Sequence, residues 1–132
     1  MSQENVEIVQ DAFAEFERGN FWVPEIFDPG VRVVWLSAIV GGELETVGVD
    51  ELTRTMKEWM QSWEHVTSVP ERFVDAGDRV VVIAEWRGRG RTSGAFTSLR
   101  YGTVLTLREA KITSMISYTD PAEALEAVGL RE

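Results

Sequence analysis

Few side chains in this sequence are placed to do acid–base chemistry. Glu85 interrupts the apolar run Val80–Ala84, and burial of that carboxylate would raise its pKa and make it a candidate general base. Strand alternation, however, puts Glu85 on one face with Val81, Ile83, Arg87 and Arg89, and it puts Val80, Val82, Ala84 and Trp86 on the other face. The pattern therefore favours an ion pair on the outer face of a sheet over a role inside a pocket.

The single histidine is another candidate acid or base. His65 follows a predicted helix over residues 50–63, and a positive charge is favourable at the C-terminal end of a helix. This position favours a capping or surface role over proton transfer. One histidine and no cysteine also exclude a multi-histidine or thiolate metal site, so we expect no metal.

Arginines gather on one predicted hairpin, at Arg87, Arg89, Arg91, Arg100 and Arg108. The first three are two residues apart, so on a strand they lie on one face and form a ridge. This ridge could bind phosphate or carboxylate, but a solvated ridge that protects the sheet from edge aggregation is favoured. Gly88 and Gly90 superficially resemble a nucleotide loop. They lie in a hairpin and not between a strand and a helix, so we expect no nucleotide cofactor.

Composition narrows the class of protein further. The chain has 132 residues and a net charge of −9, from 22 acidic and 13 basic residues, so a nucleic acid backbone would repel it on average. No apolar stretch approaches the roughly 20 residues of a membrane helix. The first ten residues lack the basic and apolar regions of a signal peptide. We therefore expect a cytoplasmic protein without nucleic acid or membrane partners.

The segment from Phe73 to Tyr118 predicts three long antiparallel strands. Apolar and polar residues alternate along it, which is typical of a sheet with one buried face. Turn signals separate the runs, at residues 75–78, 89–94 and 109–111. A further strand is predicted over residues 67–74, where Pro70 indicates an edge position or a bulge.

Two amphipathic helices are predicted upstream of these strands. The first begins at Ser2 and stops at Gly19-Asn20, and its apolar stripe contains Val6, Val9, Phe13 and Phe16. The second covers residues 50–63, and one of its faces contains Leu52, Met56, Trp59, Met60 and Trp63. Between them we expect a short helix at about residues 21–27, a turn at 28–30 and a strand at 31–36.

The last predicted helix starts at an Asp-Pro-x-Glu motif. Asp120 stands at the N-cap, Pro121 at the first helical position and Glu123 at the third, which is the pattern of a capping box. The order of elements is α+β. We predict one domain over residues 1–132, in which a curved antiparallel sheet wraps around three to four helices and forms a cone with an apolar interior.

Large aromatic side chains are candidates for the wall of a pocket in that interior. Four tryptophans could either line this pocket or pack in the core, namely Trp22, Trp35, Trp59 and Trp63. One predicted strand turns three further side chains inward, those of Tyr101, Thr103 and Leu105. The predicted ligand pocket contains Phe13, Phe16, Trp35, Trp59, Trp63, Tyr101, Thr103 and Leu105.

Several sequence blocks resemble a known family over essentially the whole chain. The blocks are SQENVEIVQDAFAEFERGN, FDPGVRVVW, DAGDRVVV, RGRGRTSG, VLTLREAKI and YTDPAEALEAVGL. They resemble SnoaL-like proteins of the nuclear transport factor 2-like superfamily, which includes ketosteroid isomerases and polyketide cyclases. The resemblance implies the cone-shaped fold, a pocket between helices and sheet, and a homodimer.

The resemblance transfers only one catalytic residue. Where the isomerases have a catalytic tyrosine, this chain has Ala12. The place of their general-base aspartate holds Trp35 or Leu36, and the place of their protonated aspartate holds Thr103 or Gly102. SnoaL-type cyclases use an aspartate after the last strand as acid and base, and Asp120 falls close to that place.

Three functional hypotheses follow from the sequence. The first is a binding protein for a small, largely apolar molecule in an aromatic cavity. The second is a cofactor-free isomerase, cyclase or lyase with Asp120 as acid and base, and Thr103 or Tyr101 as hydrogen-bond donor. The third is a non-catalytic dimeric interaction domain. The missing catalytic carboxylates favour the first or the third.

Overall fold

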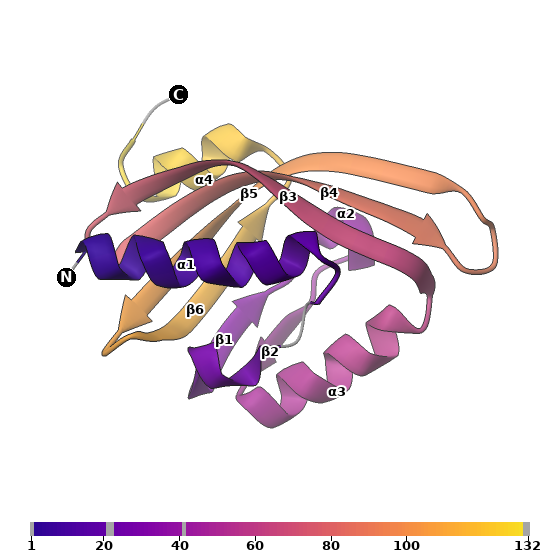
Figure 1. Ribbon diagram of the computed structural model, residues 1–132, viewed down its shortest axis with the longest axis horizontal. Helices are drawn as coiled ribbons and strands as arrows, with labels where there is room; N and C mark the ends of the chain where they lie inside the picture. The colour runs from indigo at the N-terminus through magenta and orange to yellow at the C-terminus, as the bar shows by residue number, and fades with distance from the viewer. Residues whose placement is uncertain (1, 21–22, 41, 131–132) are drawn as a thin grey trace.

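The computed structural model describes residues 2–20, 23–40 and 42–130, which form a curved six-stranded sheet with helices on both faces (Figure 1). In spatial order the strands are β2 (Glu45–Val47), β1 (Phe27–Val34), β6 (Lys111–Tyr118), β5 (Phe96–Arg108), β4 (Arg79–Gly90) and β3 (Trp63–Ala76). The helical elements are α1 (Ser2–Glu17), the 3-10 turn η1 (Pro24–Ile26), α2 (Ser37–Val40), α3 (Val49–Met60) and α4 (Pro121–Ala127). The α+β fold class is confirmed.

The sheet is mixed, which corrects the expectation of an antiparallel one. β1 runs parallel to β6, with Val33 opposite Met115 and Val34 opposite Ile116, whereas the other neighbouring strands are antiparallel. Parallel neighbours need a long connection, and here the chain passes through β2, α3 and β3–β5 before β6 returns beside β1. No local pattern in the sequence specifies that pairing.

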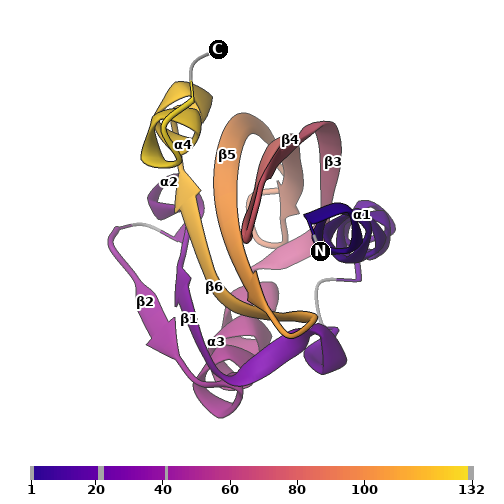
Figure 2. The ribbon, with the colours of Figure 1, turned by 90° about the vertical axis from the view of Figure 1, so that its left-hand side faces the viewer.

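The two faces of the sheet pack against different helices (Figure 2). Val80, Val82, Ala84 and Trp86 of β4 point to the inner face, where they join the main core with α1 and α3. Val81 and Ile83 point to the outer face and pack with Ala124 and Leu125 of α4. The alternation that we inferred for β4 is confirmed. Helices therefore lie on both faces, and not only inside the cone.

A glycine allows α4 to approach the outer face closely. A Cβ atom on Gly102 of β5 would lie 2.6 Å from Cβ of Ala124 and 3.1 Å from Cα of Pro121. Carbon atoms pack at about 3.5–4.0 Å, so a larger residue would displace the helix. Gly102, one of the two residues proposed for the place of an isomerase carboxylate, thus has a packing role in this chain.

The first helix ends where the sequence indicates. Gly19 has a φ of +89°, its N–H donates to the carbonyl of Phe16 at 3.0 Å, and the N–H of Asn20 donates to the carbonyl of Glu15 at 2.9 Å. These two bonds form a Schellman motif, which satisfies carbonyls at the end of a helix.

The second long helix ends at Met60, earlier than predicted. Trp63 belongs to β3, where it pairs with Gly90, so tertiary strand pairing replaces helical continuation. Arg91 supports this ending, because its guanidinium donates to the carbonyls of Gln61 at 3.1 Å and Trp63 at 2.9 Å. His65 consequently lies in β3, exposed and opposite Arg89, and not at a helix end.

The segment around Pro29 also differs from the prediction. Residues 28–30 lie within β1 and not in a turn before it, at a shift of register between Phe27 and Arg32. Gly30 donates its N–H to Oδ2 of Asp28 at 2.9 Å, so the turn chemistry is present as a local irregularity in the strand. The predicted short helix shrinks to η1, and residues 21 and 22 lie outside the described residues.

The edge strand agrees with the role proposed for Pro70. β3 stands at the end of the sheet, and its pairing with β4 shifts register between Pro70 and Arg72. A proline has no N–H for a ladder, and both an edge and a bulge tolerate it.

Candidate functional site in an aromatic cavity

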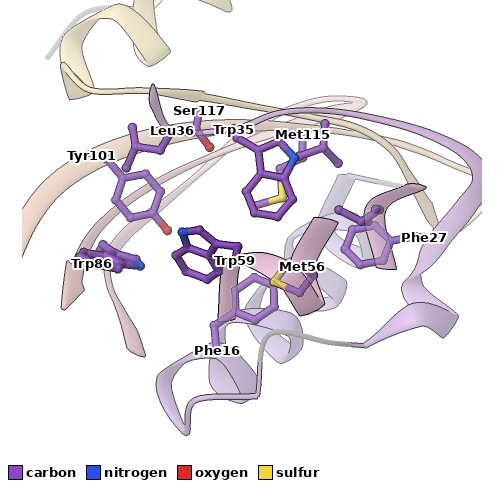
Figure 3. A pocket seen from close by; sticks show the side chains of 12 residues that line it. Phe16, Phe27, Trp35, Leu36, Met56, Trp59, Trp86, Tyr101, Met115 and Ser117 are labelled. Carbon is purple, nitrogen blue, oxygen red and sulfur yellow. The ribbon is translucent and has the colours of Figure 1, made fainter. Parts of the chain in front are cut away.

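A cavity of about 90 Å³ lies between α3, the C-terminal end of α1 and the inner face of the sheet (Figure 3). Its lining comes from many elements, which the curved sheet brings together. The lining residues are Phe16, Phe27, Val33, Trp35, Leu36, Leu52, Met56, Trp59, Trp86, Tyr101, Met115 and Ser117.

Tryptophan rings form much of the wall and hold one another in place. The ring centroids of Trp35 and Trp59 are 6.1 Å apart, and those of Trp59 and Trp86 are 6.2 Å apart. Trp63 lies behind Trp86, edge to face at 4.8 Å. Rings at these distances attract one another beyond simple burial, so the wall is stiff on this side.

The polar atoms of the wall are few. Trp35 donates its Nε1 hydrogen to Oγ1 of Thr46 in β2 at 3.3 Å, and the hydroxyls of Tyr101 and Ser68 are 2.7 Å apart. Ser117 donates to Oγ1 of Thr103 at 3.2 Å. Burial raises the pKa of Tyr101 to about 12, while the hydrogen bond with Ser68 opposes the shift.

No acid or base is among the described residues that line the cavity. Tyr101 has the only phenol among those residues; with an ordinary pKa of about 10 it is protonated at neutral pH, and burial raises this pKa further, to about 12. Glu85 lies on the outer face in an ion pair with Arg87, as the strand alternation predicts. The cavity can bind apolar surface and donate hydrogen bonds, but its own side chains offer no group that exchanges protons near pH 7.

The structure places half of the predicted pocket residues in the wall, namely Phe16, Trp35, Trp59 and Tyr101. The others are buried or packed behind it. Phe13 contacts Phe16 and Phe73 edge-on, and Leu105 belongs to the core. Thr103 accepts the hydrogen bond of the lining residue Ser117. Trp63 supports Trp86. A role of any of them in ligand binding stays a prediction, and Trp22 lies outside the described residues.

Sequence reasoning missed several residues of the wall. Trp86 shares the inward face of β4 that the alternation identifies, and Met56 shares the apolar face of α3 with Trp59. Those two could have been found from periodicity alone. Met115 and Ser117 required the register of β6 against β5, in which Ser117 lies opposite Thr103.

Asp120 is the N-cap of α4. Its Oδ1 accepts the N–H of Ala122 at 3.0 Å, and its backbone is extended, with φ −97° and ψ 115°. The N-cap interpretation is confirmed, whereas the bond from the Glu123 side chain to the N–H of Asp120 that completes a capping box stays a prediction. Asp120 is exposed and is not among the cavity residues, because α4 lies on the outer face of the sheet. Its proposed acid–base role stays a prediction.

The arginines of the ridge make local contacts. Arg87 forms an ion pair with Glu85, Arg89 stacks on the ring of Phe96 at 4.9 Å, and Arg91 donates to the carbonyls of Gln61 and Trp63. Outside the ridge, Nε of Arg100 lies 3.1 Å from Oε1 of Glu71 on β3. Among the residues that the structure describes, no three acidic, histidine or cysteine side chains converge on a possible metal position, and no helix is long and apolar enough to cross a membrane.

The fold and the cavity define a class of protein, the SnoaL-like domains of the nuclear transport factor 2-like fold. The model of the SnoaL-like domain family matches residues 9–115, so the chain belongs to this family. Among proteins with curated functions, none matches the chain.

Solved structures share the fold at low sequence identity. A nuclear transport factor 2-like protein of unknown function from Burkholderia pseudomallei is 19% identical, with a TM-score of 0.76 over 96% of this chain and 98% of its own. A candidate SnoaL-like polyketide cyclase from Jannaschia is 21% identical, with a TM-score of 0.75 over 98% and 94%. The protein TerC, crystallised with polyporic acid, is 20% identical, with a TM-score of 0.73 over 95% and 98%.

Proposed function

We propose that this protein binds a small, neutral, largely apolar molecule in the aromatic cavity. The observation behind the proposal is the composition of the wall, which joins apolar and aromatic side chains to very few polar atoms and has no charged group among the described lining residues. Such a wall is typical of small-molecule sites. TerC, which shares the fold, was crystallised with a small molecule.

The volume of the cavity limits the ligand. About 90 Å³ is less than the roughly 150 Å³ of an engineered apolar cavity that binds benzene, and far less than the roughly 300–1,000 Å³ of sites for drug-sized ligands. A single ring already requires some adjustment of the wall. Met56 is the side chain best suited to move, because it is half-buried and its unbranched thioether has many rotamers.

A binding role is favoured over catalysis for a chemical reason. An isomerase, cyclase or lyase without a cofactor needs a group that takes or gives a proton at the reacting atom. The described lining residues provide none near neutral pH, and Asp120 caps a helix on the other side of the sheet.

The test is a binding measurement with a variant that fills the cavity. Titration calorimetry of toluene into the native protein should show saturable binding, and Met56→Trp should weaken it by at least about tenfold because the larger ring occupies the space. Met60→Trp is the matched control, since Met60 lies on the same helix outside the lining. It should stay within about twofold of the native affinity. Absence of binding to the native protein, or equal affinity in the two variants, would contradict the proposal.

We also propose that two copies of this chain associate through the outer face of β1, β2 and β6. The outer patch consists of Val34, Val47 and Ile116, of which Val47 is 59% exposed and the other two are half-buried outside both core clusters. Sedimentation equilibrium should show a dimer for the native chain and a weakened one for Val47→Glu, because a charge would be buried in the interface. A native chain that stays monomeric at all concentrations would refute this.

A further inference from the structure

One buried polar atom in the cavity wall, Nε1 of Trp86, has no partner in the part of the chain that the structure describes. Trp86 is 2% exposed, and its Nε1 makes no hydrogen bond within the described residues. Buried donors in native structures are almost always paired, with protein atoms or with ordered water. An unpaired indole N–H in the wall of a cavity therefore indicates a place where a bound molecule supplies the missing acceptor.

A second donor lies on the same side of the cavity. Ser68 of β3 lies directly opposite Trp86 of β4. Tyr101 of β5 lies opposite Ala84, two residues before Trp86, so Tyr101 is a diagonal neighbour of Trp86 on the same face. The hydroxyls of Ser68 and Tyr101 share one hydrogen bond of 2.7 Å. Two hydroxyls have two protons and that bond uses one, so the pair can donate the other.

The picture of the cavity agrees with this arrangement. In Figure 3 the ring nitrogen of Trp86 and the hydroxyl of Tyr101 both point toward Trp59, at the same end of the site. The remaining wall is mostly apolar, with Phe16, Phe27 and Met56 among its residues, and the hydroxyl of Ser117 donates its hydrogen to Thr103. One end of the cavity therefore offers hydrogen-bond donors, and the rest offers apolar contact.

The charge of the ligand follows from the same residues. No cation or anion is among the described lining residues, so a charged ligand would lose its hydration without a paired charge in return. The donor protons would in addition repel a cation. A neutral acceptor, such as a carbonyl oxygen, fits both the donors and the apolar wall.

We propose that the natural ligand is a neutral carbonyl compound whose oxygen accepts a hydrogen bond from Nε1 of Trp86, beside the Tyr101–Ser68 pair. This inference rests on the proposed binding function and specifies the chemistry of its ligand. Trp86 is then the residue that selects a ketone or related carbonyl over a hydrocarbon of the same shape.

The test compares two molecules that differ in one atom group. Acetophenone has a carbonyl where α-methylstyrene has a methylene, so their shapes are nearly the same. In a cavity without a donor the hydrocarbon binds better, because the ketone loses its hydrogen bonds to water. We expect the ratio of the two dissociation constants to favour acetophenone in the native protein. In Trp86→Phe the ratio should shift toward α-methylstyrene by about 2- to 13-fold, the usual net value of one hydrogen bond.

Phe73→Leu is the control. Phe73 contacts Phe13 edge to face and is not among the described lining residues, so the loss of its ring should leave the ratio within about twofold of the native one. A crystal structure of the native protein with acetophenone provides a second measurement that needs no variant. Its carbonyl oxygen should lie within hydrogen-bond distance of Nε1 of Trp86.

The possible results separate this inference from the proposed function. If both molecules bind and the ratio is the same in Trp86→Phe as in the native protein, the carbonyl inference is wrong and apolar binding stands. If neither molecule binds the native protein, the proposed function fails and the inference fails with it. Tighter binding of tetramethylammonium than of acetophenone would show an aromatic site for cations, which also overturns the inference.

Discussion

Gly88 is the position at which a single methyl group should disturb the cavity most directly. It lies on β4 two residues after Trp86, on the same inner face, and the indole ring lies over it. A Cβ atom at Gly88 would be 2.4 Å from Cη2 and 2.8 Å from Cζ2 of Trp86. Carbon atoms pack at about 3.5–4.0 Å, so Gly88→Ala must displace the ring by about 1 Å.

The ring has little freedom to move. Trp63 packs against it at 4.8 Å and Trp59 at 6.2 Å, and the whole side chain is buried. Overpacking of this kind costs about 1–3 kcal/mol. Alanine recovers about 0.5–1 kcal/mol because it loses less conformational entropy than glycine in a strand. The free energy of unfolding should therefore fall by about 1–2 kcal/mol.

Urea denaturation measures this loss, with an unchanged m value as the sign that only stability has changed. Acetophenone titration should show a weaker affinity as well, because the indole nitrogen moves with the ring. Gly90→Ala is the control, since its Cβ would meet only the exposed Ser93, at 2.6 Å from Oγ and 3.8 Å from Cβ, and that side chain can rotate away at the loss of one exposed hydrogen bond, from the N–H of Ala95. We expect its stability to stay within about 0.5 kcal/mol of the native value. Native stability and native affinity in Gly88→Ala would refute the packing argument.

Two further substitutions test the polar groups. Asp120→Ala should lower the free energy of unfolding by about 1 kcal/mol through loss of the N-cap, whereas Asp120→Asn should leave it unchanged because asparagine caps equally well. Thermal melts distinguish the two variants, and equal melting temperatures would argue against the cap. Tyr101 keeps its proton more tightly in the folded state, because its pKa is about 12 there and about 10 in the unfolded chain. Its protonation therefore contributes fully to the free energy of unfolding below pH 10, and this contribution is lost as the pH rises through 12. Across this range the free energy of unfolding, measured by urea denaturation, should fall by about 2–3 kcal/mol more in the native protein than in Tyr101→Phe; parallel curves for the two proteins would contradict the prediction.

The family match establishes the fold and the family of this protein, whereas the proposals on its ligand rest on the residues of the cavity. The family match and the solved structures establish a SnoaL-like domain with a nuclear transport factor 2-like fold. The chemistry of the ligand is argued instead from side chains of this chain, above all from Trp86 and Tyr101. A shared fold does not transfer a reaction, so these residues decide more about function than the family does.

Features that depend on neighbours in the sequence were predictable from the sequence alone. Gly19 ends α1 and Asp120 begins α4, because capping bonds form between residues a few positions apart. The period-two alternation of β4 assigned Trp86 to the inner face and Glu85 to the outer face, because successive side chains of a strand must point to opposite sides.

Features that depend on distant partners were decided by the tertiary structure. Trp63 has a helical spacing in the sequence but joins β3, because pairing with Gly90 replaces the helical hydrogen bonds. The parallel pairing of β1 with β6 brings Val33 beside Met115, and only that register places both in the cavity wall. Periodicity specifies which face of an element is apolar, but the pairing of distant strands determines which apolar residues meet around an empty space.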